Sequence, residues 1–286
     1  MAEQSFDPGR FKSEQRRDWD VAAAGWKKWW PVFERAAQHV SDRLVELAGF
    51  KSGATVLDVA TGNGEPAVTA ARTVGAAGRV IATDQSPGML AIARERAAAL
   101  GITNIDFRES DAESLAIEER NFDAVICRWG LMFMPDLVAT LRGLHARLVP
   151  SGRLATSVWS TPDKVPMITL GADAVRKLAG LPPPPPGVLD PLRLADTSIL
   201  QGALVDAGFK DVTIERLPVT FEFESPEAFT NFRADVAAPF RALLERQPPE
   251  MRQRILDAVT EAARAYAGAD GRVRTTNETI LFAAHR

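Results

Sequence analysis

The residues with the clearest chemical meaning lie in one short stretch, where an acid and two glycines accompany an apolar run. Residues 56–67 read VLDVATGNGEPA, with Asp58 in the apolar run and Gly62 and Gly64 just before an expected helix. Glycine lacks a Cβ, so a turn built on it can bring the backbone close to a ligand. The pattern indicates a loop that lies against a nucleoside-containing cofactor.

A second acid lies at the end of the next expected strand, where an acidic residue of a nucleotide-binding sheet binds the ribose. The segment RVIATDQSPGML predicts a strand over 79–83 that ends in Asp84, twenty residues after Gly64. A carboxylate at this place can accept hydrogen bonds from both ribose hydroxyls. Each such charge-assisted bond is worth about 1.5 to 3 kcal/mol, so we expect Asp84 to set a large part of the cofactor affinity.

Alternating strands and helices must position these residues. The expected strands are 55–59, 79–83, 105–108, 122–127, 152–158, 212–223 and 279–284, and the expected helices include 66–75, 87–100, 135–148 and 196–207. Runs such as 124–127 are apolar without alternation, as in strands that helices cover on both faces. These features predict an α/β fold with a doubly wound, Rossmann-like, mainly parallel seven-stranded sheet.

Three acids follow successive strands of this sheet, namely Asp58, Asp84 and Asp111. In an open α/β sheet the ligand lies at the carboxyl ends of the strands, near the point where the strand order reverses. We therefore expect the three carboxylates to outline one site.

The rest of the chain is expected to cover that site. Residues 1–50 look helical and carry four tryptophans, which either pack this segment on the main domain or wall the ligand pocket. We expect 1–50 to cover the active site and 51–286 to form the catalytic domain, with helical lid insertions at about 160–195 and 225–270. Prolines 182–186 predict a stiff extended link.

Composition narrows the class of protein. The 286 residues are 46% apolar and 25% charged, as in ordinary globular proteins, and a net charge of −3 argues against broad nucleic-acid binding. No run approaches the roughly 20 apolar residues of a membrane span, and the start lacks a signal-peptide core, so we expect a cytoplasmic protein. Cys127 is alone and the three histidines are scattered, so we expect no disulfide and no metal site.

Four segments occur in the order and at the spacing of one enzyme family's motifs. They are VLDVATGNGEPA, TDQSPGMLAIAR, ESDAESLAIEERNFDAVICRWGLMFMPD and LHARLVPSGRLATSVW. Over residues 19–159 the chain resembles the class I S-adenosylmethionine-dependent methyltransferases, most of all the branch that contains the ubiquinone and menaquinone biosynthesis C-methyltransferases. The resemblance implies S-adenosylmethionine as cofactor and methyl transfer to a small-molecule acceptor.

The resemblance also implies roles for residues at the carboxyl edge of the sheet. Asp58 would orient the methionine amino group, directly or through water, and Asp84 would hold the ribose hydroxyls. Met89 would pack on adenine, Asp111 would accept its exocyclic amine, and the Ala112 backbone would meet the ring. The full set expected to bind the cofactor is Asp58, Ala60, Thr61, Gly62, Gly64, Asp84, Gln85, Met89, Asp111, Ala112 and Arg128. The family often has glycine where Ala60 stands, and its methyl group narrows the turn slightly.

The acceptor site is expected to be aromatic. Methyl transfer from a sulfonium is a direct displacement, so the protein must align the acceptor and exclude water, and no residue qualifies as a base from sequence. The candidates for contact with the acceptor are Trp26, Trp30, Trp129, Phe133 and Trp159. They favour an acceptor with a flat or apolar body.

Two other functions fit part of the pattern. Gly62, Gly64 and Ala67 also satisfy the G-x-G-x-x-A spacing of an NAD(P)-dependent oxidoreductase, and Asp84 could read that cofactor's ribose. A short-chain dehydrogenase would have a lysine four residues after its tyrosine. The single tyrosine here, Tyr266, has no such lysine, which argues against this alternative. The other alternative is a non-catalytic module that keeps the cofactor pocket.

Overall fold

The structure, a computed structural model, describes residues 7–179 and 190–286, and these residues form one seven-stranded sheet with flanking helices. The strands are β1 (Thr55–Val59), β2 (Arg79–Asp84), β3 (Ile105–Glu109), β4 (Phe122–Arg128), β5 (Leu148–Trp159), β6 (Lys210–Phe223) and β7 (Val273–His285). They lie in the order β3-β2-β1-β4-β5-β7-β6; the first five run parallel, and β7 is antiparallel to both its neighbours. The predicted fold is confirmed. The expected proline link at 182–186 lies outside the described residues.

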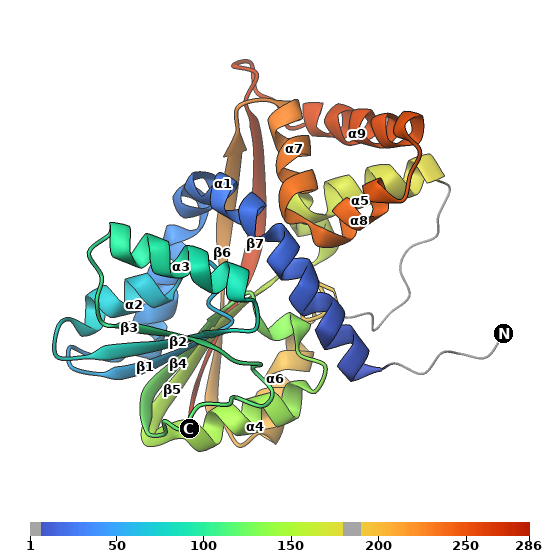
Figure 1. The fold of residues 1–286 in the computed structure, drawn as a ribbon. Helices are drawn as coiled ribbons and strands as arrows, with labels where there is room; N and C mark the ends of the chain where they lie inside the picture. The colour runs from blue at the N-terminus through green and yellow to red at the C-terminus, as the bar shows by residue number, and fades with distance from the viewer. Residues whose placement is uncertain (1–6, 180–189) are drawn as a thin grey trace.

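Helices cover both faces of the parallel part of the sheet. They are α2 (Ala67–Val74), α3 (Pro87–Ala99), α4 (Leu137–Arg147) and α6 (Thr197–Asp206), with short 3-10 helices η1 (Leu131–Phe133) and η2 (Pro162–Lys164). Figure 1 shows α2 and α3 on one face and α4 and α6 on the other. The strand order reverses between β1 and β4, which places the expected ligand edge there.

Local signals define where these helices begin and end. The Ser86 hydroxyl accepts a hydrogen bond from the backbone N–H of Met89 at 3.1 Å, and Pro87 is the first residue of α3, as predicted. Helix α2 ends at Gly75, whose φ of +65° lies in the left-handed region that glycine tolerates. The turns that precede α2 and α3 therefore meet at the carboxyl edge of the sheet.

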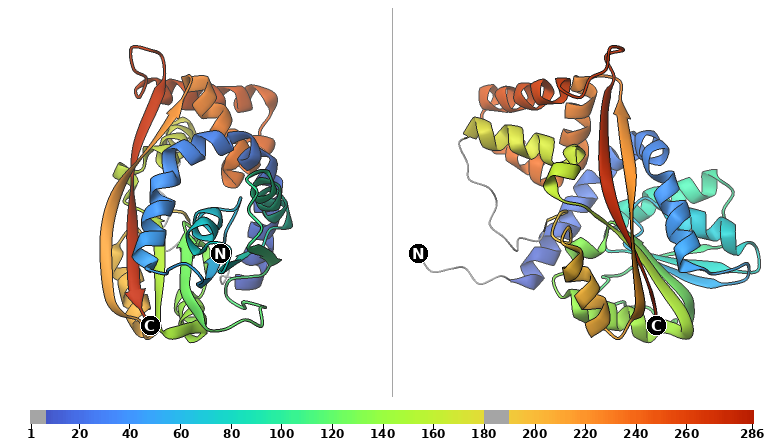
Figure 2. Two further views of the ribbon diagram at one scale, coloured as in Figure 1. Left: turned by 90° about the vertical axis from the view of Figure 1, so that its left-hand side faces the viewer. Right: turned by 180° about the vertical axis from the view of Figure 1, so that it is seen from behind.

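The N-terminal segment is one long helix, α1 (Pro8–Ala48), which is 41 residues long. Pro31 lies inside it and has no N–H to donate to the carbonyl of the preceding turn, which bends a helix. Figure 2 shows α1 as an arch. Its second half packs against the sheet, and its first half reaches across the carboxyl edge.

The hairpin of β6 and β7 is much longer than the sheet that it joins. The two strands have 14 and 13 residues and pair from Lys210 with His285 to Phe223 with Val273. Strand β7 pairs with β5 only as far as Thr279, so the remaining part of the hairpin extends beyond the carboxyl edge. The sequence indicated only 279–284 as the last strand, and β7 begins six residues earlier.

The extended part of the hairpin carries a helical cap, which we define as α5 (Pro166–Ala179), α7 (Pro226–Val236), α8 (Ala238–Glu245) and α9 (Pro249–Arg264). Helices α7, α8 and α9 lie between β6 and β7 in sequence, and α5 packs against α9 and β7. Figure 1 shows the cap beside the upper part of the hairpin. Helix α1 contacts the cap as well, because Trp29 Nε1 donates to Asp235 Oδ2 at 2.8 Å.

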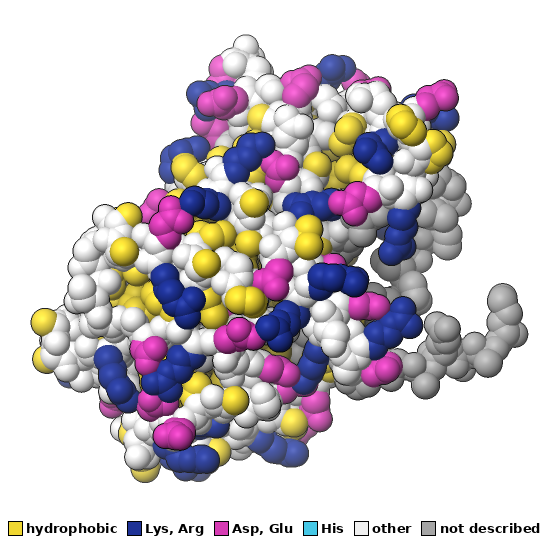
Figure 3. All heavy atoms as spheres, in the orientation of Figure 1, with side chains coloured by type: hydrophobic (Ala, Val, Ile, Leu, Met, Phe, Trp, Pro, Cys, Tyr) yellow, Lys and Arg dark blue, Asp and Glu magenta, His cyan; other side chains and the backbone are white. Residues whose placement is uncertain are grey.

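Buried apolar side chains fill both faces of the central strands, and Cys127 of β4 lies fully inside this core. On the surface, Figure 3 shows lysine and arginine side chains interspersed with acidic ones. Among the residues described, no helix is both long enough and apolar enough to cross a membrane.

The contact between α1 and α7 gives the first prediction. A Cβ added at Gly25 would collide with the carbonyl oxygen of Asp235 in α7, so Gly25→Ala must push the two helices apart. Alanine is favoured over glycine by about 1 kcal/mol inside a helix, so any loss of stability must come from this collision. We expect a lower thermal unfolding midpoint, followed by circular dichroism.

The matched control is Gly143→Ala in α4, where the described residues leave open space around the added methyl group. Its unfolding midpoint should stay the same or rise. Equal shifts for the two variants would contradict tight packing of α1 on the cap.

Candidate active site

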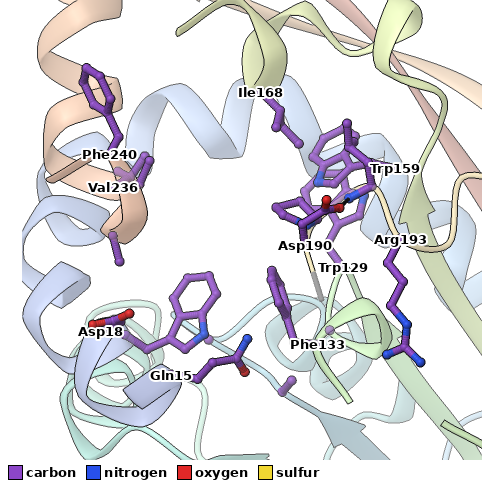
Figure 4. A pocket seen from close by; sticks show the side chains of 18 of the residues that line it. Gln15, Asp18, Trp129, Phe133, Trp159, Ile168, Asp190, Arg193, Val236 and Phe240 are labelled. Atoms are coloured by element: carbon purple, nitrogen blue, oxygen red, sulfur yellow. Dashed lines mark hydrogen bonds between the residues drawn. The ribbon is translucent and has the colours of Figure 1, made fainter. Parts of the chain in front are cut away.

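A cavity of about 1510 Å³ lies between the carboxyl edge of the sheet and the helical cap. Its walls come from the loops after β1, β2, β3 and β4, from the first half of α1, and from α5, α7 and α8. Figure 4 shows aromatic side chains facing this space from several elements. Sites for small molecules commonly measure 300 to 1,000 Å³, so the cavity has room for a cofactor and a second molecule.

The turn after β1 forms one wall. Ala60, Thr61, Gly62 and Asn63 line the cavity, and the Thr61 N–H donates to the Thr83 carbonyl at 2.9 Å, which ties the turn to β2. Ala60 has a φ of +56°, in the region where glycine is favoured, which accounts for the glycine that the family often has there.

Gly64 has another role. The structure does not bring it to the cavity: a Cβ added there would stand 3.3 Å from the Cβ of Ala93, so Gly64 allows close packing of the turn on α3. The spacing of the glycines predicts a turn, but it does not separate the glycine that lines the cavity from the glycine that packs on a helix.

Asp84 lies at the edge of the cavity and is locked to the turn. Its Oδ2 accepts from the Gly62 N–H at 2.8 Å and its Oδ1 from the Ser86 N–H at 2.9 Å. Only 8% of the residue is exposed. Burial raises the pKa of Asp84 to about 6, the two backbone hydrogen bonds oppose this rise, and the charge of Asp20 adds to it. Each carboxylate oxygen keeps a lone pair for a further donor.

Asp58 lies behind the turn and is fully buried. Its Oδ2 accepts from the Thr61 hydroxyl at 2.6 Å, whereas its Oδ1 has no hydrogen-bond partner among the described residues. Burial raises the pKa of Asp58 to about 8, although the Thr61 hydrogen bond and the positive charge of Arg128 lower it. Asp58 is not among the residues that line the cavity, so the structure does not bring its carboxyl group to the space expected for the cofactor.

The next wall comes from the loops after β2 and β3. Four expected cofactor residues line it, which are Gln85, Met89, Asp111 and Ala112. The Asp111 carboxylate also accepts from the Lys12 ammonium group of α1 at 2.8 Å, and Glu113 pairs with the same group. Lys12 could not be found from sequence patterns, because 99 residues separate it from Asp111.

The loop after β4 provides the opposite wall. The rings of Trp129 and Trp159 stack at 4.2 Å with 12° between their planes, and Trp129 Nε1 donates to the Thr279 hydroxyl at 2.9 Å. Trp129 has a φ of +57°, a conformation that costs a non-glycine residue about 1 to 2 kcal/mol. Backbone strain of this kind gathers at functional sites. Phe133 lines the same region, beside the stacked pair in Figure 4.

The four tryptophans of α1 divide between the two expected roles. Trp19 and Trp26 line the cavity, whereas Trp29 packs against the phenylalanine rings of β6 and α7. The structure does not bring Trp30 to the cavity: its ring lies 3.5 Å from the guanidinium carbon of Arg96. Trp30 therefore lies outside the group of aromatic residues that the sequence placed around the acceptor.

Arg128 ends β4 and lines the cavity, as expected. Its Nη1 donates to the Ser41 hydroxyl of α1 at 2.7 Å. Burial lowers the pKa of Arg128, while the nearby charges of Glu65 and Asp58 raise it. Within the described ranges, no group of three or more histidine, cysteine or acidic side chains could hold a metal ion.

Comparison with known proteins identifies the family. The family described as "Methyltransferase domain" matches residues 50–179. The ubiquinone/menaquinone biosynthesis C-methyltransferase of Pseudomonas putida is 30% identical over 218 residues, which cover 69% of this chain and 77% of that enzyme. The chain belongs to the class I S-adenosylmethionine-dependent methyltransferases. The enzyme of Klebsiella pneumoniae with the same name is 28% identical over 60% of the chain and 73% of its own length.

Solved structures share the fold. Phosphoethanolamine N-methyltransferase 2 of Haemonchus contortus, in complex with S-adenosyl-L-methionine, has a TM-score of 0.56 and 17% identity, covering 93% of this chain and 57% of that one. A methyltransferase from Aquifex aeolicus has a TM-score of 0.50 and 20% identity, covering 75% and 94%. The protein is an enzyme that transfers a methyl group from S-adenosylmethionine to a small-molecule acceptor, and the alternatives of an oxidoreductase and a non-catalytic module are wrong.

The buried Asp58 makes stability depend on pH. The pKa of this carboxyl rises from 3.8 to about 8 on folding, so between these values the folded state holds a proton that the unfolded state has lost. Its contribution to the free energy of unfolding therefore falls as pH rises, by up to about 1.4 kcal/mol per pH unit. Between pH 5 and 7 we expect a slope that is shallower in Asp58→Asn than in the wild type by about 1.4 kcal/mol per pH unit, in urea unfolding followed by circular dichroism. The slope that Asp84 contributes below pH 6 should remain.

The exposed Asp257 of α9 provides the matched control. Asp257→Asn changes the net charge equally and should keep the wild-type slope. A wild-type slope in Asp58→Asn would show that Asp58 does not take up a proton on folding.

Proposed function

We propose that the acceptor of this methyltransferase has a flat, apolar body that lies against the stacked rings of Trp129 and Trp159. The observation that carries the proposal is this stacked pair, which lines the cavity at the end of β4 and β5. Large rigid rings provide contact area for a planar molecule at little cost in side-chain entropy. Phe133 extends the same apolar surface, and its ring meets that of Trp19 edge to face at 5.6 Å.

We also propose which residues hold the cofactor. A buried polar group supports the fit, because Asn63 lines the cavity at the turn after β1 and its Nδ2 has no hydrogen-bond partner among the described residues. Asp84 would accept from the ribose hydroxyls, Met89 would pack on the adenine, and Asp111 would accept from its exocyclic amine. Bound there, S-adenosylmethionine supplies a methyl group on a positively charged sulfur.

The chain's own contribution to the reaction is alignment and exclusion of water. A direct displacement needs the acceptor atom in line with the bond that breaks, so a rigid wall opposite the cofactor lowers the barrier. We propose that residues 1–50 cover the site and that the insertions at about 160–195 and 225–270 act as its lid. In support, α1 contributes Lys12, Trp19 and Trp26 to the cavity, and α5, α7 and α8 close it from the other side.

The placement of the ribose predicts the effect of Asp84→Ala. This change removes the acceptor of charge-assisted hydrogen bonds, each worth about 1.5 to 3 kcal/mol, so S-adenosylhomocysteine should bind at least about 10-fold more weakly. Isothermal titration calorimetry measures the affinity, and circular dichroism checks the fold. The matched control is Glu109→Ala, which removes an acid exposed at the end of β3 and should keep the wild-type affinity. Unchanged affinity in Asp84→Ala would reject this placement.

The aromatic wall predicts which acceptors are methylated. In a panel of phenols, hydroquinones and small polar molecules, we expect turnover of the flat members, and Trp159→Leu should lower kcat/KM for them roughly 2- to 10-fold, since an aromatic pair contributes about 0.5 to 1.5 kcal/mol. The affinity for S-adenosylhomocysteine should not change.

Trp30→Leu is the matched control for this test, because Trp30 packs on Arg96 away from the cavity. It should leave kcat/KM near the wild-type value. Turnover of small polar acceptors alone, or an equal loss in both variants, would argue against a flat acceptor.

A further inference from the structure

Arg233 of α7 is a positively charged residue in the wall of the cavity that lacks an acidic partner. Its Nη2 donates to the backbone carbonyl of Ile168 in α5 at 3.3 Å. Its Nε is buried and has no hydrogen-bond acceptor, and no carboxylate among the described residues forms an ion pair with it. The guanidinium group therefore keeps unused donors beside the cavity.

Two other cations that line the described part of the cavity form ion pairs. Lys12 pairs with Asp111 at 2.8 Å. Arg176 of α5 pairs with Asp173, one turn earlier on the same helix. Their charges are already balanced inside the protein, so neither needs a ligand as counter-ion.

Two further arginines of the wall lie close to acids. Arg128 lies near the charge of Glu65 and donates to a hydroxyl of α1. Arg193 donates to the backbone carbonyl of Met134 at 2.7 Å; burial lowers the pKa of Arg193, and the charge of Glu113 opposes this effect. Figure 4 shows the Arg193 side chain directed away from the stacked tryptophans.

Unlike the other cations that line the cavity, Arg233 has no acidic group near it to balance its charge. Burial alone lowers the pKa of Arg233, to about 10, and no acidic neighbour opposes that effect. The group therefore stays protonated at neutral pH. A buried charge without a partner destabilises a protein, and an anion that binds beside it removes that penalty.

The position of Arg233 connects it with the proposed acceptor site. Its hydrogen bond to Ile168 places the guanidinium next to a residue that Figure 4 shows beside Trp159. A flat molecule against the tryptophan rings would thus have its outer end near the cap, where α5 and α7 meet. At this end the cavity presents an unpaired positive charge.

We propose that Arg233 binds a carboxylate group on the acceptor, so that the substrate class is flat carboxylic acids. A guanidinium group offers a planar fork of N–H donors that matches the two oxygens of a carboxylate. This inference rests on the proposed function, because it concerns the acceptor of the same site. Arg233 is a binding residue here and takes no part in the displacement.

A pair of probes that differ only in charge tests the proposal. The wild-type enzyme, saturated with S-adenosylhomocysteine, is titrated with 2-naphthoate and with its neutral amide, 2-naphthamide, and binding is followed by nuclear magnetic resonance. Since a hydrogen bond to a charged group is worth about 1.5 to 3 kcal/mol, we expect the carboxylate to bind about 10-fold or more tightly than the amide. In Arg233→Met this preference should fall to within about 2-fold, and Arg233→Lys should keep part of it.

The control for net charge is Arg264→Met, which removes an exposed arginine of α9 that pairs with Glu261. It should keep the wild-type preference. Equal binding of the two probes, tighter binding of the amide, no binding of 2-naphthoate at millimolar concentration, or a preference that survives in Arg233→Met would each overturn the proposal.

Two further measurements separate this inference from the proposed function. Methionine fills a similar volume without a charge, so Arg233→Met should unfold at the wild-type temperature or higher and bind S-adenosylhomocysteine with unchanged affinity. A lower unfolding temperature with an unchanged preference would indicate a structural role for Arg233. Failure of the wild-type enzyme to bind S-adenosylhomocysteine would reject the cofactor site itself.

Discussion

The long pairing of β6 with β7 is the interaction on which the site depends. At about 3.4 Å per residue, the 14 residues of β6 span roughly 48 Å, whereas the five residues of β1 span roughly 17 Å. The hairpin therefore has to extend beyond the parallel sheet, and the helices inserted between its strands are carried past the carboxyl edge. The cavity is the space that remains between this edge and the cap. Helix α1 closes one side of it, because its second half packs on the sheet and its first half contacts α7.

The parallel part of the fold could be predicted from sequence because its signals are local. Ser86 caps α3, Gly75 ends α2, and the apolar runs of the central strands need no partner to be recognised. Most predicted boundaries lie within two residues of those observed. The link between Asp84 and the glycine turn was also predictable in outline, since both follow strands that lie side by side.

The first half of β7 was missed for a physical reason. Thr275 and Asn277 are buried there at 0% and 1% exposure, in a segment where a strand pattern would have apolar residues. The Asn277 amide donates to the Val219 carbonyl at 3.1 Å and accepts from the Met167 N–H at 2.8 Å. It joins β6, β7 and the start of α5 in this way. Residue type does not distinguish a buried polar side chain with hydrogen-bond partners from a polar side chain in a solvated loop. The strand therefore could not be extended from sequence alone.

The environments of Trp30 and Arg233 also could not be predicted, because they depend on contacts with residues that are distant in sequence. Trp26 and Trp30 are four residues apart on one helix, so their side chains are expected on nearly the same side of it. The Trp30 ring nevertheless packs on Arg96 of α3 and not in the cavity. The surroundings of Arg233 are even less accessible from sequence, because only the three-dimensional structure shows whether an arginine has an acidic partner. The completed cavity has buried carboxyl groups at the cofactor end and an unpaired guanidinium at the cap end. Under the proposed function, the Asp84 carboxylate would hold the cofactor and the Arg233 guanidinium an anionic acceptor, so the two reactants would enter the cavity in defined orientations before any bond changes.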